Sequence, residues 1–417
     1  MHQDTSTCRA CQSPNRVEIL AFGEMPLADG LLTDLQLKQL EPRYPLTVMF
    51  CRDCSLVQIR ENVAADILFG EDYPYFSSFS PAWLEHCRQN AVELIDSREL
   101  DSSSLVVEIA CNDGYLLQNF TERNIPVLGV DPAPGPAAAA EAQGITVLQE
   151  FFTSELAGQL ADEGQLADVV LGNNVLAHVP DLTGFVQGIY TILKPDGVAV
   201  IECPYVKDLI EHCEFDTIYH EHHCYFSVTA LSKLFASQQL HLNDVRLLPT
   251  HGGSLRLFVE KWPNRSPRVE QLLQEEADQG LGRESYYQDF ARRVHDVQNG
   301  LRDLLQKLKA SGKRIAAYAA AAKGATLLNS AGIGTELLDY VVDRNRHKQG
   351  KVMPGIHLPI EDPAKLIEDQ PDYVLILAWN FKDEILLQQE EYRRCGGHFI
   401  VPIPTPQIVE PERVSVG

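Results

Sequence analysis

The fold of this chain is decided by the stretch Leu105-Val-Val-Glu-Ile-Ala-Cys-Asn-Asp-Gly114. Its first five residues make an apolar run of strand length, and a short polar turn that ends in glycine follows them. Residues 115–120 then have the spacing of an amphipathic helix. A strand, a tight turn and a helix in this order predict a unit of a parallel, doubly wound sheet.

The same pattern continues after this stretch. Apolar runs at residues 127–130, 168–171 and 198–201 are separated by spacers of helix length, which is typical of parallel strands. Residues 241–245 and 254–259, split by Gly252-Gly253, predict a hairpin that closes the edge of this sheet.

Three regions that differ in composition and in hydrophobic pattern indicate three domains. Residues 1–68 are loop-rich and hold four of the ten cysteines, and residues 69–262 carry the parallel α/β pattern. Residues 263–417 begin with a helical stretch that Ser266-Pro267 is suited to cap, and a second βα pattern starts near Lys313. One apolar face of the helical stretch is predicted to be core: Phe290, Val294, Val297, Leu301, Leu304 and Leu308.

The bulk composition narrows the possible partners. With 417 residues and a net charge of −23, the chain lacks the basic balance that binds nucleic acid or an anionic membrane. The first residues have no basic and apolar regions of a signal peptide, and no apolar run reaches the length of a membrane span. We therefore expect a cytoplasmic location, where paired cysteines indicate metal more than disulfides.

Two CxxC pairs are the strongest local motif. Cys8, Cys11, Cys51 and Cys54 can bring four thiolates into the tetrahedron that zinc prefers, with strands filling the long gap between the pairs. Four protein ligands leave no open position, so the predicted site is structural. Buried free cysteines or an iron–sulfur cluster are the alternatives.

The turn after the first strand has the features of a nucleoside site. Glu108 stands at the strand end, Ala110 and Asn112 lie in the turn, Gly114 tolerates positive φ, and Asp131 ends the next strand, where it can reach ribose hydroxyls. The acidic turn without a GxGxxG motif favours the cationic S-adenosylmethionine, but a dinucleotide stays open.

A later strand ends in Asn173 and Asn174, with His178 shortly after. These three side chains are expected to face the cofactor or substrate, unless the asparagines only cap the following turn.

Tyr219-His-Glu-His-His-Cys-Tyr225 is a dense cluster of ionisable side chains. Three histidines, a carboxylate and two phenols offer general bases that titrate near neutral pH. A metal site and a structural polar network are the alternatives.

Taken together, these residues resemble the three-domain C-methyltransferases that act on TDP-linked 4-keto-deoxysugars. The resemblance covers nearly the whole chain and includes both cysteine pairs, Pro26-Leu-Ala-Asp29, Tyr73-Pro-Tyr-Phe-Ser-Ser-Phe-Ser80, the Glu108–Gly114 turn, Tyr219-His-Glu-His222, His251-Gly-Gly-Ser-Leu-Arg256, Asp343-Arg-Asn-Arg-His-Lys-Gln-Gly350 and Ala378-Trp-Asn-Phe-Lys382. It implies an α/β protein with a small N-terminal zinc-binding domain (1–68), a central Rossmann-like class I methyltransferase domain (69–262) and a C-terminal Rossmann-like α/β domain (263–417) that helps to hold the substrate.

The resemblance also implies roles for single residues. His222 resembles the family's general base, Tyr219 and Glu221 its pocket partners, and His178 and Tyr73 line the reacting sugar. Two departures stand out: Tyr318-Ala-Ala-Ala-Ala-Lys-Gly324 replaces the family's Gly-Ala-Pro-type turn, and His223-Cys224 replaces a phenylalanine-containing sequence.

The expected reaction is enolate chemistry at C3 of the keto-sugar, with S-adenosylmethionine as methyl donor, in deoxysugar or antibiotic biosynthesis. We expect the substrate to be held by Tyr75, Lys323, Arg344, His347, Lys348 and Asn380, although the basic members of this set can equally be a solvated surface. The chain is expected to act as a monomer or homodimer. Another enolisable carbonyl or hydroxyl acceptor, a dehydrogenase and a non-catalytic zinc- and nucleotide-binding adaptor are the rival readings.

Overall fold

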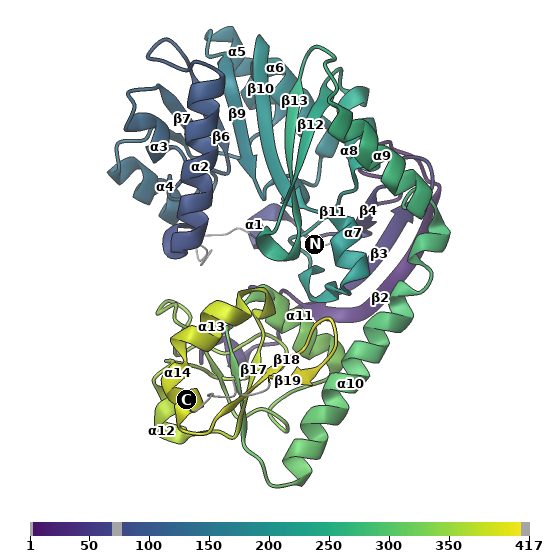
Figure 1. The fold of residues 1–417 in the computed structure, drawn as a ribbon, viewed down its shortest axis with the longest axis vertical. Coiled ribbons are helices and arrows are strands. Elements are labelled where there is room, and N and C mark those ends of the chain that lie inside the picture. Colours follow the sequence, from purple (N-terminus) through teal and green to yellow (C-terminus); the bar gives the residue numbers. More distant parts are fainter. Residues whose placement is uncertain (1–2, 69–76, 410–417) are drawn as a thin grey trace, which may run out of the picture. The chain divides into compact units, whose positions relative to one another are not determined.

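The structure is a computed structural model that describes residues 3–68 and 77–409 (Figure 1). The chain forms two compact units, and each unit is assembled from separate stretches. The first unit comprises Met1–Val17, Met49–Val206 and His223–Tyr286, and the second comprises Glu18–Val48, Lys207–His222 and Tyr287–Gly417. No helix in the described part of the chain is long and apolar enough to span a membrane.

A seven-stranded sheet forms the centre of the first unit, in the order β12-β13-β10-β9-β6-β7-β8. Five strands from β8 to β10 are parallel, and β13 and β12 complete the edge as an antiparallel hairpin, as predicted. The strands are β6 (Val106–Ile109), β7 (Val127–Val130), β8 (Val147–Leu148), β9 (Ala167–Asn173), β10 (Leu193–Pro204), β12 (His241–Leu248) and β13 (Ser254–Glu260).

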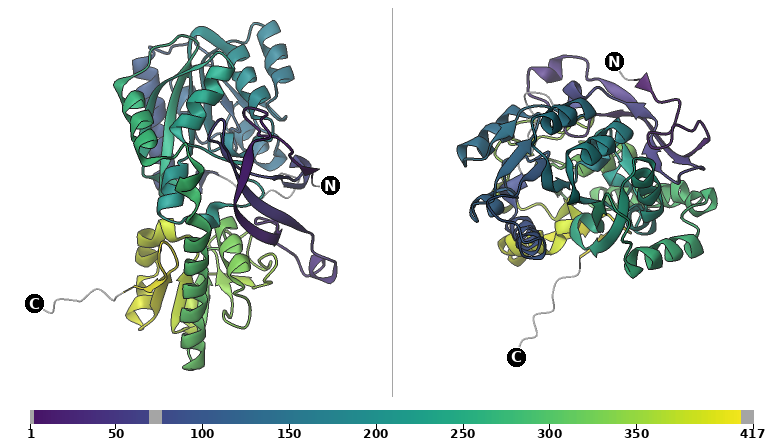
Figure 2. Two further views of the ribbon diagram at one scale, coloured as in Figure 1. Left: turned by 90° about the vertical axis from the view of Figure 1, so that its right-hand side faces the viewer. Right: turned by 90° about the horizontal axis from the view of Figure 1, so that it is seen from above.

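Apolar residues on both faces of the strands bury this sheet between two layers of helices (Figure 2). In β10, Ala199 and Ile201 join one core cluster, whereas Val198 and Val200 join the other. This alternation follows from the period of two residues in a strand, and it explains why the strands read as continuous apolar runs. The longer helices are α2 (Pro81–Ser97), α4 (Pro134–Ala142), α5 (Ser154–Asp162), α6 (Leu182–Ile192), α8 (Val228–Ser237) and α9 (Pro267–Gln279).

Side-chain caps define where several of these helices begin. The predicted cap of α9 is confirmed, because the Ser266 hydroxyl accepts from the Val269 amide and Pro267 occupies the first turn. Ser80 and Ser227 cap α2 and α8 in the same way. Such caps satisfy amides that the helix itself leaves without a partner.

The cysteine-rich N-terminal segment forms β-strands. A four-stranded sheet has the order β11-β4-β3-β2, and β1 (Gln3–Asp4) pairs with β5 (Glu61–Asn62). Its strands are β2 (Arg16–Pro26), β3 (Arg43–Cys51), β4 (Val57–Ile59) and β11 (Cys224–Tyr225). As predicted, strands fill the gap between Cys11 and Cys51.

The second unit contains a six-stranded sheet in the order β16-β15-β14-β17-β18-β19. All neighbouring strands are parallel except β18 and β19. The chain runs outward from β14 to one edge and then crosses to β17, so a topological switch point lies between these two strands. The strands are β14 (Ile315–Tyr318), β15 (Val341–Val342), β16 (Ile360–Glu361), β17 (Tyr373–Ile376), β18 (His398–Val401) and β19 (Gln407–Ile408).

The long helix of this unit is α10 (Phe290–Ala310), and it is followed by α11 (Ala322–Ala331), α12 (Lys365–Asp369), α13 (Lys382–Gln388) and α14 (Glu390–Arg394). The predicted apolar face of α10 is confirmed from Phe290 to Leu301. Beyond that point Leu305 is buried, and the predicted Leu304 and Leu308 are only partly covered. A helix with 3.6 residues per turn can place either Leu304 or Leu305 on its buried face. Packing in this structure buries Leu305.

Candidate functional site

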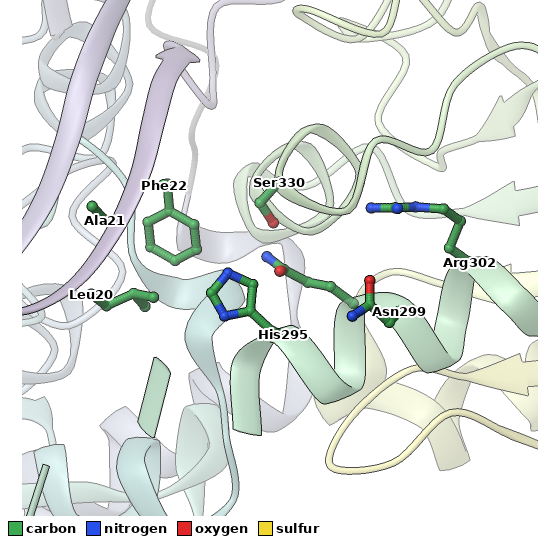
Figure 3. A pocket seen from close by; sticks show the side chains of 8 residues that line it. Leu20, Ala21, Phe22, His295, Asn299, Arg302 and Ser330 are labelled. Atoms are coloured by element: carbon green, nitrogen blue, oxygen red, sulfur yellow. The ribbon is translucent and has the colours of Figure 1, made fainter. Parts of the chain in front are cut away.

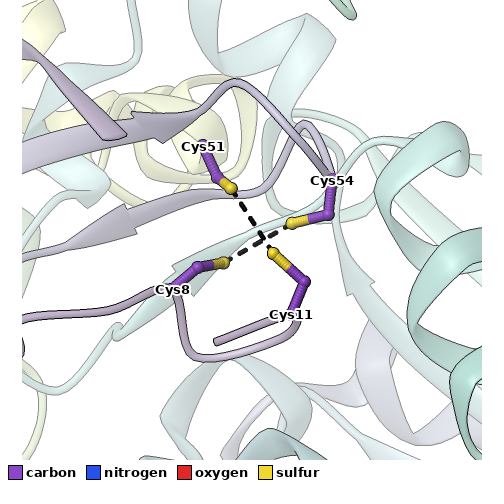
Figure 4. A group of neighbouring side chains, drawn as sticks. All are labelled: Cys8, Cys11, Cys51 and Cys54. Atoms are coloured by element: carbon purple, nitrogen blue, oxygen red, sulfur yellow. Dashed lines mark hydrogen bonds between the residues drawn. The ribbon is translucent and has the colours of Figure 1, made fainter. Parts of the chain in front are cut away.

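The two CxxC pairs meet within the first unit. Their four sulfur atoms lie within 4.8 Å of one another and point to a common centre (Figure 4). The Sγ–Sγ distance is 3.5 Å for Cys8 and Cys54 and 3.6 Å for Cys11 and Cys51. Four sulfurs at about 2.3 Å from a tetrahedral zinc ion stand about 3.8 Å apart, so the donor set fits structural zinc.

The backbone has the same shape in both cysteine pairs. Gln12 and Ser55, each the residue after the second cysteine, adopt positive φ of 59° and 69°. Their amides donate to the carbonyls of Cys8 and Cys51, both at 2.9 Å. Two similar turns thus position the thiols.

The predicted cofactor turn joins β6 to the short helix α3 (Gln118–Thr121). Ala110, Asn112 and Gly114 all have positive φ. A Cβ atom on Gly114 would collide with Ile145, so glycine is required here by packing as well as by φ. The turn is tied to the next strand because the Asn112 amide donates to Asp131 Oδ2 at 2.8 Å.

Two polar side chains are buried near the ends of neighbouring strands. Both side-chain polar atoms of Asn173 have no hydrogen-bond partner in the described part of the chain, whereas the carboxyl of Glu108 has a side-chain hydrogen bond with Tyr115. Burial raises the pKa of Glu108 well above its usual range, Asp131 and Asp113 add to this, and Tyr115 opposes it. Such groups are costly unless a ligand satisfies them, and a cationic ligand with hydroxyl and amine groups fits them.

Asn112 has a further contact that its motif does not reveal. Its side-chain oxygen accepts from the Ser77 amide at 2.9 Å, and Asp113 Oδ2 accepts from the Ser78 amide at 3.2 Å. These bonds attach the short turn η2 (Ser77–Phe79) to the cofactor turn. Tyr73 and Tyr75, which precede it, lie outside the described residues.

The segment after β9 positions the remaining predicted cofactor residues. Asn174 adopts a positive φ of 54°, and its amide donates to the Glu202 carbonyl at 2.8 Å. The turn η3 (Leu176–His178) begins without a side-chain hydrogen bond at its cap residue Val175.

Glu202 belongs to a buried ion cluster at the end of β10 that the sequence analysis did not identify. Its carboxylate lies 2.7 Å from Arg256 Nε and 2.9 Å from His86 Nε2. His86 comes from α2, and Arg256 is paired with Glu202 in the register of β10 and β13. Glu202 ends its strand next to Asn173, so the strand-end argument applied to Asn173 could also have pointed to it.

Tyr219 and His222 form a close pair in the second unit. The Tyr219 hydroxyl lies 3.1 Å from His222 Nε2, and His222 Nδ1 lies 2.8 Å from the Thr217 carbonyl oxygen. A carbonyl can only accept, so Nδ1 carries the proton and the neutral ring presents an unprotonated Nε2. This is the tautomer that a general base at Nε2 requires.

The other histidines of the cluster do not join this pair. His220 is buried, and its Nε2 lies 3.0 Å from the Pro45 carbonyl oxygen. His223 is buried in the first unit, where its backbone bonds Ala177 and Ile59. The sequence grouped six polar side chains, and folding leaves Tyr219 and His222 as a partly exposed pair.

Glu221 is buried beside a second acidic residue. Burial raises the pKa of Glu221 to about 8, and Asp29 adds to this shift. Burial also raises the pKa of Asp29, which Lys348 opposes. The Pro26-Leu-Ala-Asp29 motif therefore supplies an acidic neighbour that adds to the effect of burial on the pKa of Glu221.

The predicted substrate residues of the second unit divide into two groups. Lys323 donates to Asn380 Oδ1 at 2.9 Å, and Lys348 donates to the Ala320 carbonyl at 2.8 Å, so both belong to the region around the turn between β14 and α11. Arg344 is exposed and pairs with Glu384, and His347 is exposed.

A small hollow elsewhere in the second unit contains none of these residues (Figure 3). It is lined by Leu20, Ala21, Phe22, His295, Gln298, Asn299, Arg302 and Ser330. Neither the Tyr219–His222 pair nor the β14–α11 turn contributes to this hollow. We therefore do not place the methyl-transfer site there.

Comparisons with known proteins match three consecutive regions. Residues 8–69 match a family described as a zinc binding domain, residues 83–244 a "Methyltransferase domain", and residues 249–404 a "C-methyltransferase C-terminal domain". The chain is 36% identical to the C-methyltransferase NovU of Streptomyces niveus over 97% of both proteins.

More distant matches cover a smaller part of the chain. The chain is 31% identical to a ubiquinone biosynthesis O-methyltransferase of Azorhizobium caulinodans over 23% of this chain and 38% of that protein. An S-adenosylmethionine-dependent methyltransferase from Clostridium acetobutylicum aligns with a TM-score of 0.36 and 13% identity, over 42% of this chain and 91% of its own.

The α/β sheet and its cofactor turn are those of an S-adenosylmethionine-dependent methyltransferase with an added zinc site. More narrowly, the chain belongs to the C-methyltransferase family that combines a zinc-binding domain, a methyltransferase domain and its own C-terminal domain. This membership excludes the adaptor and dehydrogenase alternatives.

Proposed function

We propose that this enzyme methylates C3 of a nucleotide-linked 4-keto-deoxysugar, with TDP as the nucleotide, in deoxysugar or antibiotic biosynthesis. The observation that carries the proposal is the His222 tautomer: Nδ1 is tied to the Thr217 carbonyl, and Nε2 faces the Tyr219 hydroxyl. A base and a hydrogen-bond donor side by side are what the conversion of a ketone to its enolate requires.

In this proposal His222 Nε2 removes the C3 proton, and the electron pair of that bond moves to the 4-keto oxygen. Tyr219 donates a hydrogen bond to the developing oxyanion, with Glu221 or His178 as a second donor. Glu221 is suited to donate because its raised pKa of about 8 keeps the carboxyl protonated at neutral pH.

When bound, S-adenosylmethionine would supply an electrophilic methyl group: C3 of the enolate bonds the methyl carbon as the 4-keto group re-forms, and the electron pair of the broken S–CH3 bond leaves with S-adenosylhomocysteine. We assign its binding to Glu108, Ala110, Asn112, Gly114, Asp131, Asn173 and Asn174. The protonated His222 then returns its proton to solvent. Tyr73 is assigned to the reacting sugar on the family resemblance alone.

The nucleotide is assigned to the second unit. The β14–α11 turn lies at the topological switch point of its sheet, and the amino terminus of α11 is suited to an anion. Lys323 and Lys348 at this turn are the first candidates for the pyrophosphate, with Asn380 beside Lys323. Arg344, His347 and Tyr75 complete the proposed set. The three-domain boundaries 1–68, 69–262 and 263–417 also stay a prediction.

The test measures methyl transfer to the sugar and, separately, exchange of its C3 proton with solvent. The protein is incubated with labelled S-adenosylmethionine and a panel of TDP-4-keto-6-deoxysugars, and separately with S-adenosylhomocysteine in deuterated water. We expect a carbon-bound methyl group at C3 and wash-out of the C3 proton for at least one sugar. His222→Asn should lower both rates by a factor of about 100 or more, whereas the exposed His295→Asn should not.

If no sugar of the panel is methylated and none exchanges its C3 proton, the sugar proposal is wrong. An active panel of other enolisable carbonyls or of hydroxyl acceptors would then establish the alternative acceptor. Full activity of His222→Asn would remove His222 as the base.

A further inference from the structure

We infer that Trp379 is a positioning residue for His222, because its indole N–H holds the turn whose carbonyl fixes the tautomer of that histidine. The inference rests on the proposed role of His222 as the base. It also gives a function to the Ala378-Trp-Asn-Phe-Lys382 motif, of which the proposed reaction uses only Asn380.

The first contact is a buried hydrogen bond between residues far apart in the sequence. Trp379 Nε1 donates to Asp216 Oδ2 at 2.7 Å, across 163 positions of the chain. Asp216 is fully buried, and its Oδ1 has no hydrogen-bond partner in the described ranges. Burial raises the pKa of Asp216 to about 6, and Lys323 and the Trp379 bond oppose that rise.

The second step is the turn that carries Asp216. The turn η4 (Phe215–Thr217) is closed by hydrogen bonds from the amide and the hydroxyl of Thr217 to the Glu214 carbonyl, at 3.1 and 2.7 Å. Phe215 is fully buried and stacks on Phe22 with ring centroids 6.3 Å apart. Asp216 therefore anchors a compact turn rather than a free loop.

The third step links this turn to the base. Thr217, the residue after Asp216, presents its carbonyl oxygen 2.8 Å from His222 Nδ1. A shift of Asp216 moves the adjoining peptide group, and the bond that selects the Nδ1–H tautomer lengthens with it. Nε2 would then lose its fixed direction toward Tyr219.

Trp379 is itself held in one orientation. It opens the turn η7 (Trp379–Phe381), and the Lys323 ammonium lies 4.7 Å from the centre of its ring. The same ammonium donates to Asn380 Oδ1 at 2.9 Å. A cation over the ring face and a bond to the next residue fix the direction of the indole N–H.

The test removes one hydrogen bond and keeps the aromatic ring. Trp379→Phe retains a ring for Lys323 but lacks the N–H donor, and Trp262→Phe is the control because Trp262 is 68% exposed. With S-adenosylhomocysteine and a keto-sugar substrate in deuterated water, Trp379→Phe should slow C3 proton exchange about tenfold, with KM changed less than about twofold. Trp262→Phe should match the wild type.

A second readout needs no substrate and therefore separates this inference from the proposed function. In ¹⁵N-histidine NMR spectra of the free protein, the His222 signal, identified by its loss in His222→Asn, should report the Nδ1–H tautomer. Trp379→Phe should shift it toward a mixture of tautomers. An unchanged His222 signal, or a raised KM with an unchanged exchange rate, would overturn the inference in favour of a direct substrate contact.

Substitution at Asp216 distinguishes the hydrogen bond from the charge. Asp216→Asn keeps an acceptor for the indole N–H and should recover most of the exchange rate, whereas Asp216→Ala should match Trp379→Phe. If Asp216→Asn loses as much as Asp216→Ala, the charge and not the Trp379 bond holds the turn, and the inference is wrong.

Discussion

Four non-glycine residues with left-handed backbone lie where strands end at the proposed sites. Ala110 and Asn112 follow β6, Asn174 follows β9, and Ala319 follows β14. A residue with a Cβ atom costs roughly 1–2 kcal/mol in this conformation. Strained positions persist at functional turns because the surrounding structure enforces them.

Ala319 offers a clean measurement of this strain, since its φ is 76° and glycine takes this conformation without penalty. Ala319→Gly should raise the free energy of unfolding by about 0.5–1 kcal/mol, after allowance for the greater freedom of glycine in the unfolded chain. Urea denaturation would measure it. The neighbouring Ala320→Gly should be destabilising, and a similar gain at both positions would contradict the assignment of strain to Ala319.

The buried cluster of Glu202, His86 and Arg256 predicts a dependence of stability on pH. Burial alone would raise the pKa of Glu202, but His86 and Arg256 outweigh it and hold the pKa below 4.5. A carboxyl with a depressed folded-state pKa stabilises the fold above its unfolded-state pKa, and it loses this contribution as the pH falls through the folded-state value.

Glu202→Gln should therefore lower the free energy of unfolding by about 3–5 kcal/mol at pH 7, because Arg256 is left buried without its counter-charge. The difference from the wild type should shrink as the pH drops below 4.5, which chemical denaturation at a series of pH values would show. Glu93→Gln, which removes the partly exposed partner of Arg246, should cost at most about 1 kcal/mol. If the free energies of unfolding of Glu202→Gln and the wild type differ by the same amount at all pH values, the ion cluster does not cause the pH dependence.

At the scale of elements, the predicted zinc ligands lie in turns and at strand ends. Cys51 ends β3, and Cys54 lies in the turn that leads to β4. Both strands belong to the four-stranded sheet, and Cys8, Cys51 and Cys54 are buried. Metal binding is therefore expected to contribute directly to the stability of this segment.

Metal analysis should find one zinc ion per chain. Cys51→Ser should lose it and lower the midpoint of thermal unfolding by about 10 °C, as should prolonged chelation of the wild type. Cys395→Ser, at an exposed cysteine outside the cluster, should keep both the zinc and the midpoint. Bound iron with a visible absorption band would instead indicate the alternative cluster.

At the scale of the whole molecule, the chain contains two Rossmann-like sheets with different strand orders. The seven-stranded sheet ends in an antiparallel hairpin, whereas the six-stranded sheet has its switch point between β14 and β17. The first places the buried Glu108 and the unpartnered Asn173 on neighbouring strands, near their carboxyl ends. In the proposed function the methyl donor therefore binds at the first sheet and the nucleotide of the substrate at the second.

This division predicts which ligands stabilise the protein. S-adenosylhomocysteine at 100 times its Kd should add about 2.7 kcal/mol to the free energy of unfolding, and NAD should add nothing. Thermal scans would show the difference. Asn173→Ala should lose the response to S-adenosylhomocysteine and keep the basal midpoint, because Asn173 has no protein partner to lose in the described ranges. Stabilisation by NAD alone would refute the assignment.

The features that the sequence determined by itself are local. The apolar strands, the glycine of the cofactor turn, the Ser266 cap and the two CxxC pairs each depend on residues within a few positions of one another. Backbone geometry acts over that range, so these predictions are confirmed in the structure, and the zinc ligands follow from two such turns.

Tertiary structure alone decided the contacts that tune the site. The Trp379–Asp216 bond spans 163 positions, and the His86–Glu202 contact spans 116. No spacing rule encodes such pairs, because they depend on which elements pack together once the core has formed. The histidine cluster shows this best: its six polar residues look equivalent in the sequence, and folding buries His220 and His223 and leaves Tyr219 beside an Nε2 of defined tautomer.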